Sequence, residues 1–195
     1  MQIGILALQG AFVEHENALK KLGVNYFEIR KKSDLSNKMD GLIIPGGEST
    51  VMGKLLKDLD LFNEIKLRID NGLPVFGTCA GMILLAKRIQ DEEENHLGTM
   101  NIEVKRNAYG RQLGSFYVES AFADYNDVKM PFIRAPYIVK VGKNVQVLSC
   151  VDDKIVAARE NNQLVTSFHP ELTEEIRVHS YFIKMVEDFQ KNNQK

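Results

Sequence analysis

The chain has 195 residues and a formal net charge of -1, with 25 basic and 26 acidic residues. A chain of this length can bury a sizeable core, so we expect residues 1–195 to form a single domain. The near-neutral balance gives no basic patch of the kind that binds nucleic acid or an anionic membrane surface. We therefore expect a small, nearly neutral substrate and neither nucleic acid nor membrane as a partner.

Cysteine usage and apolar runs bear on the compartment. Cys79 and Cys150 lie far apart, which argues against a disulfide framework, and neither has a histidine at a metal-ligand spacing. The apolar start, MQIGILALQG, lacks the basic segment and cleavage site of a signal peptide, and we interpret it as a buried strand. Other apolar runs are too short to span a bilayer. We expect a soluble, cytoplasmic protein with no metal and no cofactor.

Along the first half of the chain, short apolar runs alternate with stretches of helical periodicity. This alternation predicts an α/β fold with three layers, in which helices cover both faces of a doubly wound, mostly parallel sheet of the flavodoxin-like kind. The expected strands are residues 3–8, 25–30, 41–44 and 74–76, and the expected helices are residues 12–22, 49–59, 61–69 and 80–87.

The second half of the chain is dominated by closely spaced strand candidates. Antiparallel additions to a parallel sheet are common, and we expect them here. Asp152-Asp153, between two apolar runs, predicts a hairpin turn. The expected strands are residues 102–105, 114–119, 132–141, 145–150, 154–159 and 164–168, followed by a helix over residues 173–190.

The strongest chemical signal is the segment Gly77-Thr78-Cys79-Ala80-Gly81, between an expected strand and an expected helix. It has the G-x-nucleophile-x-G pattern of a sharp strand-to-helix turn, with cysteine as the nucleophile. Glycines relieve backbone clashes at such a turn, and the helix N-terminus favours a thiolate. A free cysteine is otherwise a common core residue. The context favours the nucleophile for Cys79, whereas Cys150 is assigned to the core.

A cysteine nucleophile needs a base, and His169 is the best-placed histidine. It follows an expected strand, and Glu171 is close enough to reach back to one imidazole nitrogen while the other faces the thiol. The remaining histidines have other interpretations: His15 is expected at the surface, His96 in a solvated loop and His179 packed in the core.

The segment Pro45-Gly46-Gly47-Glu48-Ser49-Thr50 follows the third expected strand and opens a helix. A phosphate cradle is one interpretation, but the spacing of a nucleotide-binding loop is missing. Backbone N–H groups of this loop, together with that of Ala80, could instead form an oxyanion hole. A third interpretation is a tight turn in which Glu48 or Ser49 caps the helix.

Three motifs in order, PGGES, GTCAGM and FHPEL, resemble the class I glutamine amidotransferases. The stretches ALQGAFVEH, RNAYGRQ and FIRAP are similar, more specifically, to the glutaminase subunits of the two-protein pyridoxal 5'-phosphate synthase. The resemblance extends from Leu6 to the C-terminal helix. The related amidotransferase of histidine biosynthesis has a similar length but lacks these three stretches.

The resemblance implies roles for particular residues. Cys79 would be the nucleophile, His169 the base and acid, and Glu171 its orienter. Arginine suits the α-carboxylate of a free amino acid, although arginines without the motif would be ordinary surface charges. The implied glutamine contacts are Gly47, Glu48, Ser49, Arg106, Ile133 and Arg134, with Gly47 and Ala80 in the oxyanion hole.

The resemblance also implies a partner, a (β/α)8-barrel synthase subunit in a large hetero-oligomer, which receives ammonia released from L-glutamine. It implies that the free glutaminase is nearly inactive, and reorientation of the Gly46-Gly47 peptide on docking is a plausible switch. Two alternatives stay open. The turn could serve a cysteine peptidase or another acyl hydrolase, or the chain could be a non-catalytic scaffold.

Overall fold

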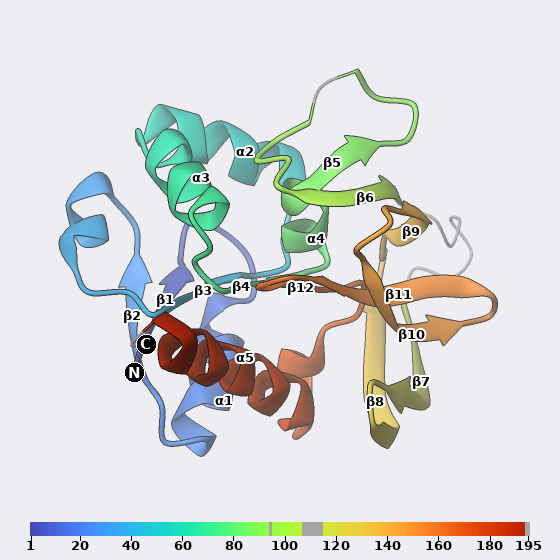
Figure 1. The fold of residues 1–195 in the computed structure, drawn as a ribbon. Helices are drawn as coiled ribbons and strands as arrows, with labels where there is room; N and C mark the ends of the chain where they lie inside the picture. The colour runs from blue at the N-terminus through green and yellow to red at the C-terminus, as the bar shows by residue number, and fades with distance from the viewer. Residues whose placement is uncertain (94, 107–114, 194–195) are drawn as a thin grey trace.

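The computed structural model describes residues 1–93, 95–106 and 115–193. The RNAYGRQ stretch therefore lies outside the described residues, apart from Arg106. A central sheet separates two helical layers (Figure 1). One face carries α2 (Ser49–Asp58), α3 (Phe62–Asp70) and α4 (Ala80–Leu85), and the other carries α1 (Phe12–Lys21) and α5 (Arg177–Asn193). The predicted three-layer α/β class is confirmed.

Five parallel strands form the half of the sheet between the helical layers. Their order is β2-β1-β3-β4-β12, which is the doubly wound order of flavodoxin-like folds. In such sheets ligands bind outside the carboxyl ends of the strands, where the strand order reverses. The strands are β1 (Gln2–Leu6), β2 (Asn25–Ile29), β3 (Gly41–Ile44), β4 (Val75–Thr78) and β12 (Gln163–Thr166).

The predicted antiparallel additions extend this sheet beyond β12, although the outermost strand, β5, pairs with β6 in parallel. The β10–β11 hairpin turns at Asp152 and Asp153, whose φ values of 47° and 58° suit the tight turns that join antiparallel strands. The added strands, in spatial order, are β11 (Lys154–Glu160), β9 (Tyr137–Val141), β6 (Met100–Lys105) and β5 (Ala86–Ile89), with β10 (Gln146–Val151) paired to β11.

A two-stranded ribbon, β7 (Ser115–Phe122) and β8 (Tyr125–Ile133), stands apart from the main sheet. The predicted single strand over residues 132–141 is therefore wrong, because β8 ends at Ile133 and β9 begins at Tyr137. Arg134 has φ 42° between them, and Pro136 has no N–H to continue a ladder. The predicted helix over residues 80–87 is also too long, since Ala86–Ile89 pairs with β6.

Alternate residues of the parallel strands fill two separate cores. Ile43 and Phe76 point to the layer of α1 and α5, whereas Leu42 and Val75 point to the layer of α2, α3 and α4. All four side chains are fully buried. The strands are thus apolar on both faces, as sheets covered by helices on both sides require.

Cys150 is exposed, so its assignment to the core is wrong. The pairing of β10 with β11 shifts register between Val147 and Cys150, and Leu148 and Ser149 are both buried there. A bulge of this kind changes which residues face inward, and it turns Cys150 outward.

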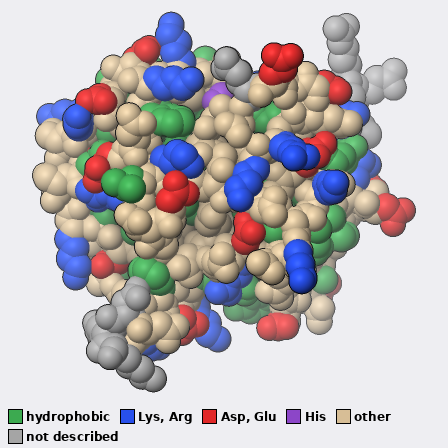
Figure 2. Space-filling view, turned by 45° about the horizontal axis from the view of Figure 1, so that its top comes forward, with side chains coloured by type: hydrophobic (Ala, Val, Ile, Leu, Met, Phe, Trp, Pro, Cys, Tyr) green, Lys and Arg blue, Asp and Glu red, His purple; other side chains and the backbone are tan. Residues whose placement is uncertain are grey.

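The surface and the helices add two further observations. On the face shown in Figure 2, basic and acidic side chains are interspersed, and apolar side chains form small separate areas. Among the described residues, no helix is long and apolar enough to cross a membrane.

Candidate active site

Cys79 occupies a sharp turn between β4 and α4. Its φ and ψ are 47° and -97°, a strained conformation for a residue with a side chain. The Cys79 N–H donates to the Thr166 carbonyl of β12 at 2.8 Å, which helps to hold the turn. Glycine is required on both sides: a Cβ on Gly77 would lie 2.7 Å from the Gly81 carbonyl carbon, and a Cβ on Gly81 would lie 2.2 Å from the Ile44 oxygen.

His169 and Glu171 follow β12 and lie beside this turn. The His169 Nδ1 and the Glu171 Oε1 are 2.7 Å apart, as expected from their spacing in the sequence. The backbone N–H of His169 donates to the Pro131 carbonyl of β8 at 2.9 Å, and this hydrogen bond connects the loop after β12 to the β7–β8 ribbon. With Nδ1 bound to the carboxylate, Nε2 is the nitrogen left to interact with Cys79.

His169 has an unusual protonation equilibrium. Burial lowers its pKa, but hydrogen bonds to the Cys79 and Glu171 side chains and their charges outweigh burial and raise the pKa to about 10. The imidazole therefore carries protons on both ring nitrogens at neutral pH and is positively charged. A cationic imidazolium beside a thiol favours the thiolate, which is the nucleophilic form.

The glycine loop after β3 is fixed by the loop after β1. The Gly46 carbonyl accepts from the Ala11 N–H at 3.1 Å, and the Gln9 Oε1 accepts from the Glu48 N–H at 2.7 Å. A Cβ on Gly46 would lie only 2.2 Å from the Cε1 of His169. The loop therefore packs directly against the imidazole ring, and only glycine fits at this position.

Glu48 caps helix α2. Its carboxylate accepts from the Thr50 N–H at 3.2 Å and from the Val51 N–H at 2.8 Å. Burial raises the Glu48 pKa, but these backbone hydrogen bonds and the nearby Arg106 outweigh burial and lower it. Of the two capping residues considered from the sequence, the structure thus shows Glu48 in this position. A carboxylate at a helix N-terminus also complements the helix dipole.

These loops surround a cavity of about 510 Å³, which is large enough for an amino acid. Glu171 lies behind His169, and Ala80 begins α4, where its N–H has no intrahelical acceptor. Most residues predicted to contact substrate line the cavity, namely Gly47, Glu48, Ser49, Cys79, Arg106, Ile133, Arg134 and His169. The sequence interpretation gave no role to five other lining residues: Gln9, Gly10, Ala11, Ile83 and Leu172.

The polar side chains of the cavity differ in their availability. Ser49 is buried, and its hydroxyl has no hydrogen-bond partner among the described residues, so a ligand could use it. Arg106 lies 3.0 Å from the Glu92 carboxylate and 3.4 Å from that of Glu48, with Thr50 Oγ1 at 3.2 Å. The Arg106 guanidinium is thus already paired with two carboxylates before any substrate binds.

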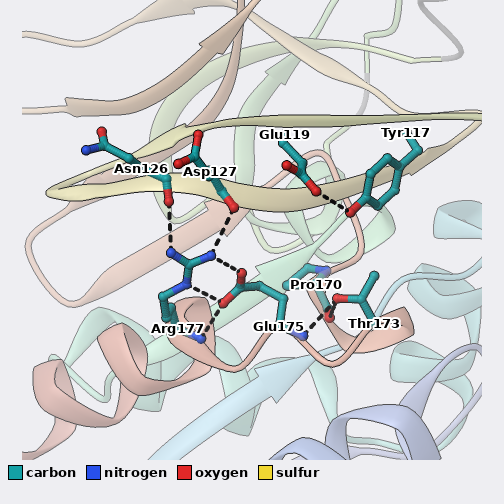
Figure 3. A network of polar contacts seen from close by, with 8 residues as sticks. All are labelled: Tyr117, Glu119, Asn126, Asp127, Pro170, Thr173, Glu175 and Arg177. Carbon is teal, nitrogen blue, oxygen red and sulfur yellow. Dashed lines mark hydrogen bonds and ion pairs between the residues drawn. The ribbon is translucent and has the colours of Figure 1, made fainter.

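The ribbon is anchored beside the catalytic loop (Figure 3). The Arg177 guanidinium donates to the Asn126 carbonyl at 2.8 Å and to the Asp127 carbonyl at 3.0 Å, and its Nε donates to Glu175 at 2.8 Å. The ribbon ends at Ile133, whose carbonyl lies 4.0 Å from the Cys79 sulfur. One arginine therefore connects the far end of the ribbon to the segment that follows Glu171.

His15 is fully buried, so the predicted surface position is wrong. Its helix presents the side chains of His15, Ala18 and Leu19 inward, although charged residues surround His15 in the sequence. The His15 Nε2 lies 3.6 Å from the Glu171 carboxylate, and its Nδ1 lies 2.9 Å from the Nε2 of His179. His179 is buried, as predicted.

His96, expected in a solvated loop, is half-buried, and a Cβ on Gly53 would lie 2.3 Å from its Nδ1. Across the described part of the chain, no three His, Cys, Asp or Glu side chains are arranged to hold a metal ion. A strained cysteine, a protonated histidine and a carboxylate orienter are instead the arrangement for acyl transfer through a thioester.

Known proteins are similar to this chain over nearly its whole length. The sequence matches the SNO glutamine amidotransferase family over residues 5–188. It is 60% identical over 186 residues to the pyridoxal 5'-phosphate synthase subunit PdxT of Methanocorpusculum labreanum, covering 95% of this chain and 98% of the relative. It is 56% identical over 191 residues to the PdxT of Streptococcus pneumoniae strain CGSP14, covering 96% of this chain and 98% of that relative.

A solved structure described as a glutamine amidotransferase superposes with a TM-score of 0.90 at 43% identity, covering 95% of this chain and 98% of that one. The resemblance drawn from the three ordered motifs is thus confirmed by sequence and by fold. The chain belongs to the SNO glutamine amidotransferase family.

Proposed function

We propose that this single-domain chain is the glutaminase subunit of a cytoplasmic pyridoxal 5'-phosphate synthase, hydrolysing L-glutamine to L-glutamate and ammonia for vitamin B6 biosynthesis. Family membership and relatives named as PdxT at 56–60% identity support this proposal. The observation that carries it is the strained Cys79 beside His169, with the His169 Nδ1 held 2.7 Å from Glu171 above a cavity of amino-acid size.

The proposed reaction begins with attack of the Cys79 thiolate on the side-chain carbonyl carbon of glutamine. The backbone N–H groups of Gly47 and Ala80 receive the oxyanion, and each such donor contributes about 2.7–4 kcal/mol to lowering the barrier. His169 then gives its proton to the departing nitrogen, which leaves as ammonia and a glutamyl thioester. Water, deprotonated by His169, hydrolyses the thioester to glutamate and regenerates the thiolate.

Polar residues of the cavity would hold the amino-acid end of glutamine. Arg106 and Arg134 can accept the α-carboxylate, because a guanidinium binds a carboxylate through paired hydrogen bonds. The Glu48 carboxylate suits the α-ammonium group. Ser49 supplies a buried hydroxyl with no other partner in the described part of the chain, and the backbone of Ile133 closes the site beside Cys79.

The product ammonia would be protonated in water and lose its nucleophilicity, so a shielded path to a synthase subunit is expected. We propose that this partner is a (β/α)8 barrel within a large hetero-oligomer and that docking activates the glutaminase. Reorientation of the Gly46-Gly47 peptide would have to break the 3.1 Å hydrogen bond between the Gly46 carbonyl and the Ala11 N–H. Glycine at both positions makes such a rotation sterically cheap.

Glutamine hydrolysis and pyridoxal phosphate formation, each measured with and without the synthase subunit, test this proposal. Cys79→Ala should abolish glutamine-dependent product formation, a loss of about 10⁴-fold or more, while added ammonium still supports it. Cys150→Ala, which changes the exposed cysteine, is the matched control and should retain both activities.

Two outcomes would contradict the proposal. Unchanged glutamine-dependent synthesis by the Cys79→Ala variant would indicate a scaffold whose ammonia comes from elsewhere. Cleavage of peptides in preference to glutamine would indicate a peptidase or another acyl hydrolase. A glutamine-analogue alkylator, mapped to the residue that it labels, separates these outcomes, because the proposal requires labelling at Cys79.

A further inference from the structure

Glu171 lies between two histidines, and the proposed mechanism uses only one of them. Its Oε1 is 2.7 Å from the Nδ1 of His169 and 3.6 Å from the Nε2 of His15. The side chains of His15 and Glu171 are both fully buried, with 0% exposed area. Because water does not screen this polar contact, its electrostatic effect on the carboxylate is larger than that of the same contact at the surface.

The same nitrogen of His15 also reaches the strand that carries the nucleophile. The His15 Nε2 lies 3.2 Å from the Oγ1 of Thr78, and Thr78 immediately precedes Cys79. His15 therefore touches two members of the site from behind, the orienting carboxylate and the residue before the strained turn. It lies on α1, away from the cavity, and does not line it.

His179 contacts the opposite nitrogen of His15. Its Nε2 lies 2.9 Å from the Nδ1 of His15, and its own Nδ1 has no partner in the described residues. Burial, with smaller effects from the charges of His179 and His169, holds the pKa of His15 well below its usual value, and burial lowers the pKa of His179 to about 4. Both rings are therefore neutral at physiological pH.

Two neutral rings joined by one hydrogen bond allow two arrangements of protons. If His15 donated from Nδ1, its Nε2 lone pair would face the Glu171 carboxylate, and His179 would bury an N–H with no acceptor. If His179 donates from Nε2, the His15 Nε2–H faces Thr78 and Glu171, and only an acceptor lone pair of His179 is unpaired. Buried orphan N–H groups are rarer than under-satisfied acceptors, and a carboxylate repels a lone pair. The second arrangement is favoured.

We propose that His15 is a positioning residue for the thioester chemistry: its Nε2–H, directed by His179, keeps Glu171 and Thr78 in the orientation that His169 and Cys79 require. This inference rests on the proposed glutaminase function. His15 touches no substrate and exchanges no proton in the reaction. It acts through Glu171 on the imidazole and through Thr78 on the turn.

Two substitutions at position 15 separate positioning from packing. Glutamine places its amide nitrogen near the Nε2 position, so His15→Gln keeps a donor toward Glu171 and Thr78 but loses the acceptor for His179. Asparagine places its amide near the Nδ1 position, so His15→Asn keeps an acceptor for His179 but loses the donor toward Glu171. Each variant thus removes one of the two polar contacts of His15 and keeps the other.

Steady-state glutamine hydrolysis is measured for each variant in complex with the synthase subunit, beside thermal unfolding. For His15→Asn we expect a kcat about tenfold or more below that of the wild type, with KM nearly unchanged. The variant disturbs the orientation of the catalytic groups, and it removes no contact with the substrate. His15→Gln should keep most of kcat although its Tm falls by roughly 2–4 °C or more. Ser149→Ala, which removes a buried hydroxyl bonded at 2.6 Å to the Ala121 carbonyl, should lower Tm without lowering kcat.

If the kcat of His15→Asn and His15→Gln followed Tm alone, or if neither changed kcat, the proposal would be overturned. The wild-type protein gives a second test that needs no variant. Long-range ¹⁵N–¹H NMR of the histidine rings should show His15 and His179 both protonated at Nε2, and a proton on the Nδ1 of His15 would contradict the proposal. Because this measurement needs no turnover, a failure of the glutaminase function, seen as an inactive wild-type complex, remains distinguishable from a failure of the inference.

Discussion

Two histidines of this protein, His169 and His179, are both buried yet have opposite protonation equilibria. The pKa of His169 is raised to about 10 because, against burial, the Cys79 and Glu171 side chains stabilise its cation. The pKa of His179 falls to about 4, because burial lowers it more than the charge of Glu175 raises it. Burial alone therefore keeps an imidazole neutral at physiological pH. A carboxylate in contact with the ring instead keeps it protonated, so that it can donate a proton. Glu171 lies at the boundary between the two environments.

The largest expected effect comes from removing that carboxylate. Glu171→Gln should lower the kcat of the complex by about 10³–10⁴-fold. The carboxylate would no longer fix the tautomer of the His169 imidazole or stabilise its protonated form. The pKa of His169 should then fall from about 10 toward its ordinary 6.5, because Glu171 no longer opposes burial and only Cys79 still stabilises the cation. Histidine ring NMR followed over pH measures this change. A His169 pKa that stayed near 10 in the variant would show that Cys79 alone sustains the cation.

The next effect is on stability, and the two histidines should act in opposite directions. His179 has a pKa of about 4 in the folded state and an ordinary value of 6.5 in the unfolded chain. The unfolded chain binds more protons between these values, so stability is present above pH 6.5 and is lost as the pH falls toward 4. The loss is about 3 kcal/mol at about 1.4 kcal/mol per pKa unit. His15 adds to it in the same direction.

For His169 the sign is reversed. Its folded-state pKa of about 10 exceeds 6.5, so its contribution is complete below pH 6.5 and is lost as the pH rises toward 10. Urea unfolding between pH 4.5 and 9 should show a maximum near pH 6.5. His179→Gln should flatten the acid side and His169→Gln the alkaline side, whereas Ser149→Ala should lower the whole curve without changing its slopes. Equal slopes in the wild type and in His179→Gln would contradict the assignment.

Much of the fold could be predicted because the parallel half depends on local patterns. Its strands are short apolar runs between turn residues, and periodicity identifies them. The second half was harder, since one apolar stretch over residues 132–141 contains two strands from different sheets. The break depends on the φ of 42° at Arg134, which hydrophobicity does not encode. The exposure of Cys150 depends on a bulge in the pairing of β10 with β11.

The candidate site divides in the same way. Cys79, His169 and Glu171 lie in local motifs, so the sequence alone was sufficient to propose them as the candidate catalytic residues. Gln9 was missed because its contact with the Glu48 N–H depends on β1 and β3 being neighbours in the sheet. His15 was missed because its charged sequence neighbours suggested a surface helix, while its inward face depends on packing against α5. Tertiary neighbours, more than local propensity, decide such positions.

The smallest expected effect on the chemistry comes from Gly46, the residue at which the loop after β3 packs against the His169 ring. A Cβ on Gly46 would lie 2.2 Å from the Cε1 of His169, so Gly46→Ala should displace the ring and lower kcat by about 10–100-fold. Gly53→Ala is the matched control, because its Cβ would lie 2.3 Å from the Nδ1 of His96, a ring outside the triad. His96 is half-buried and can move outward, and alanine favours the helix, so this variant should keep its activity. Equal losses of kcat in the two variants would show that loop distortion, and not the position of the His169 ring, limits the reaction.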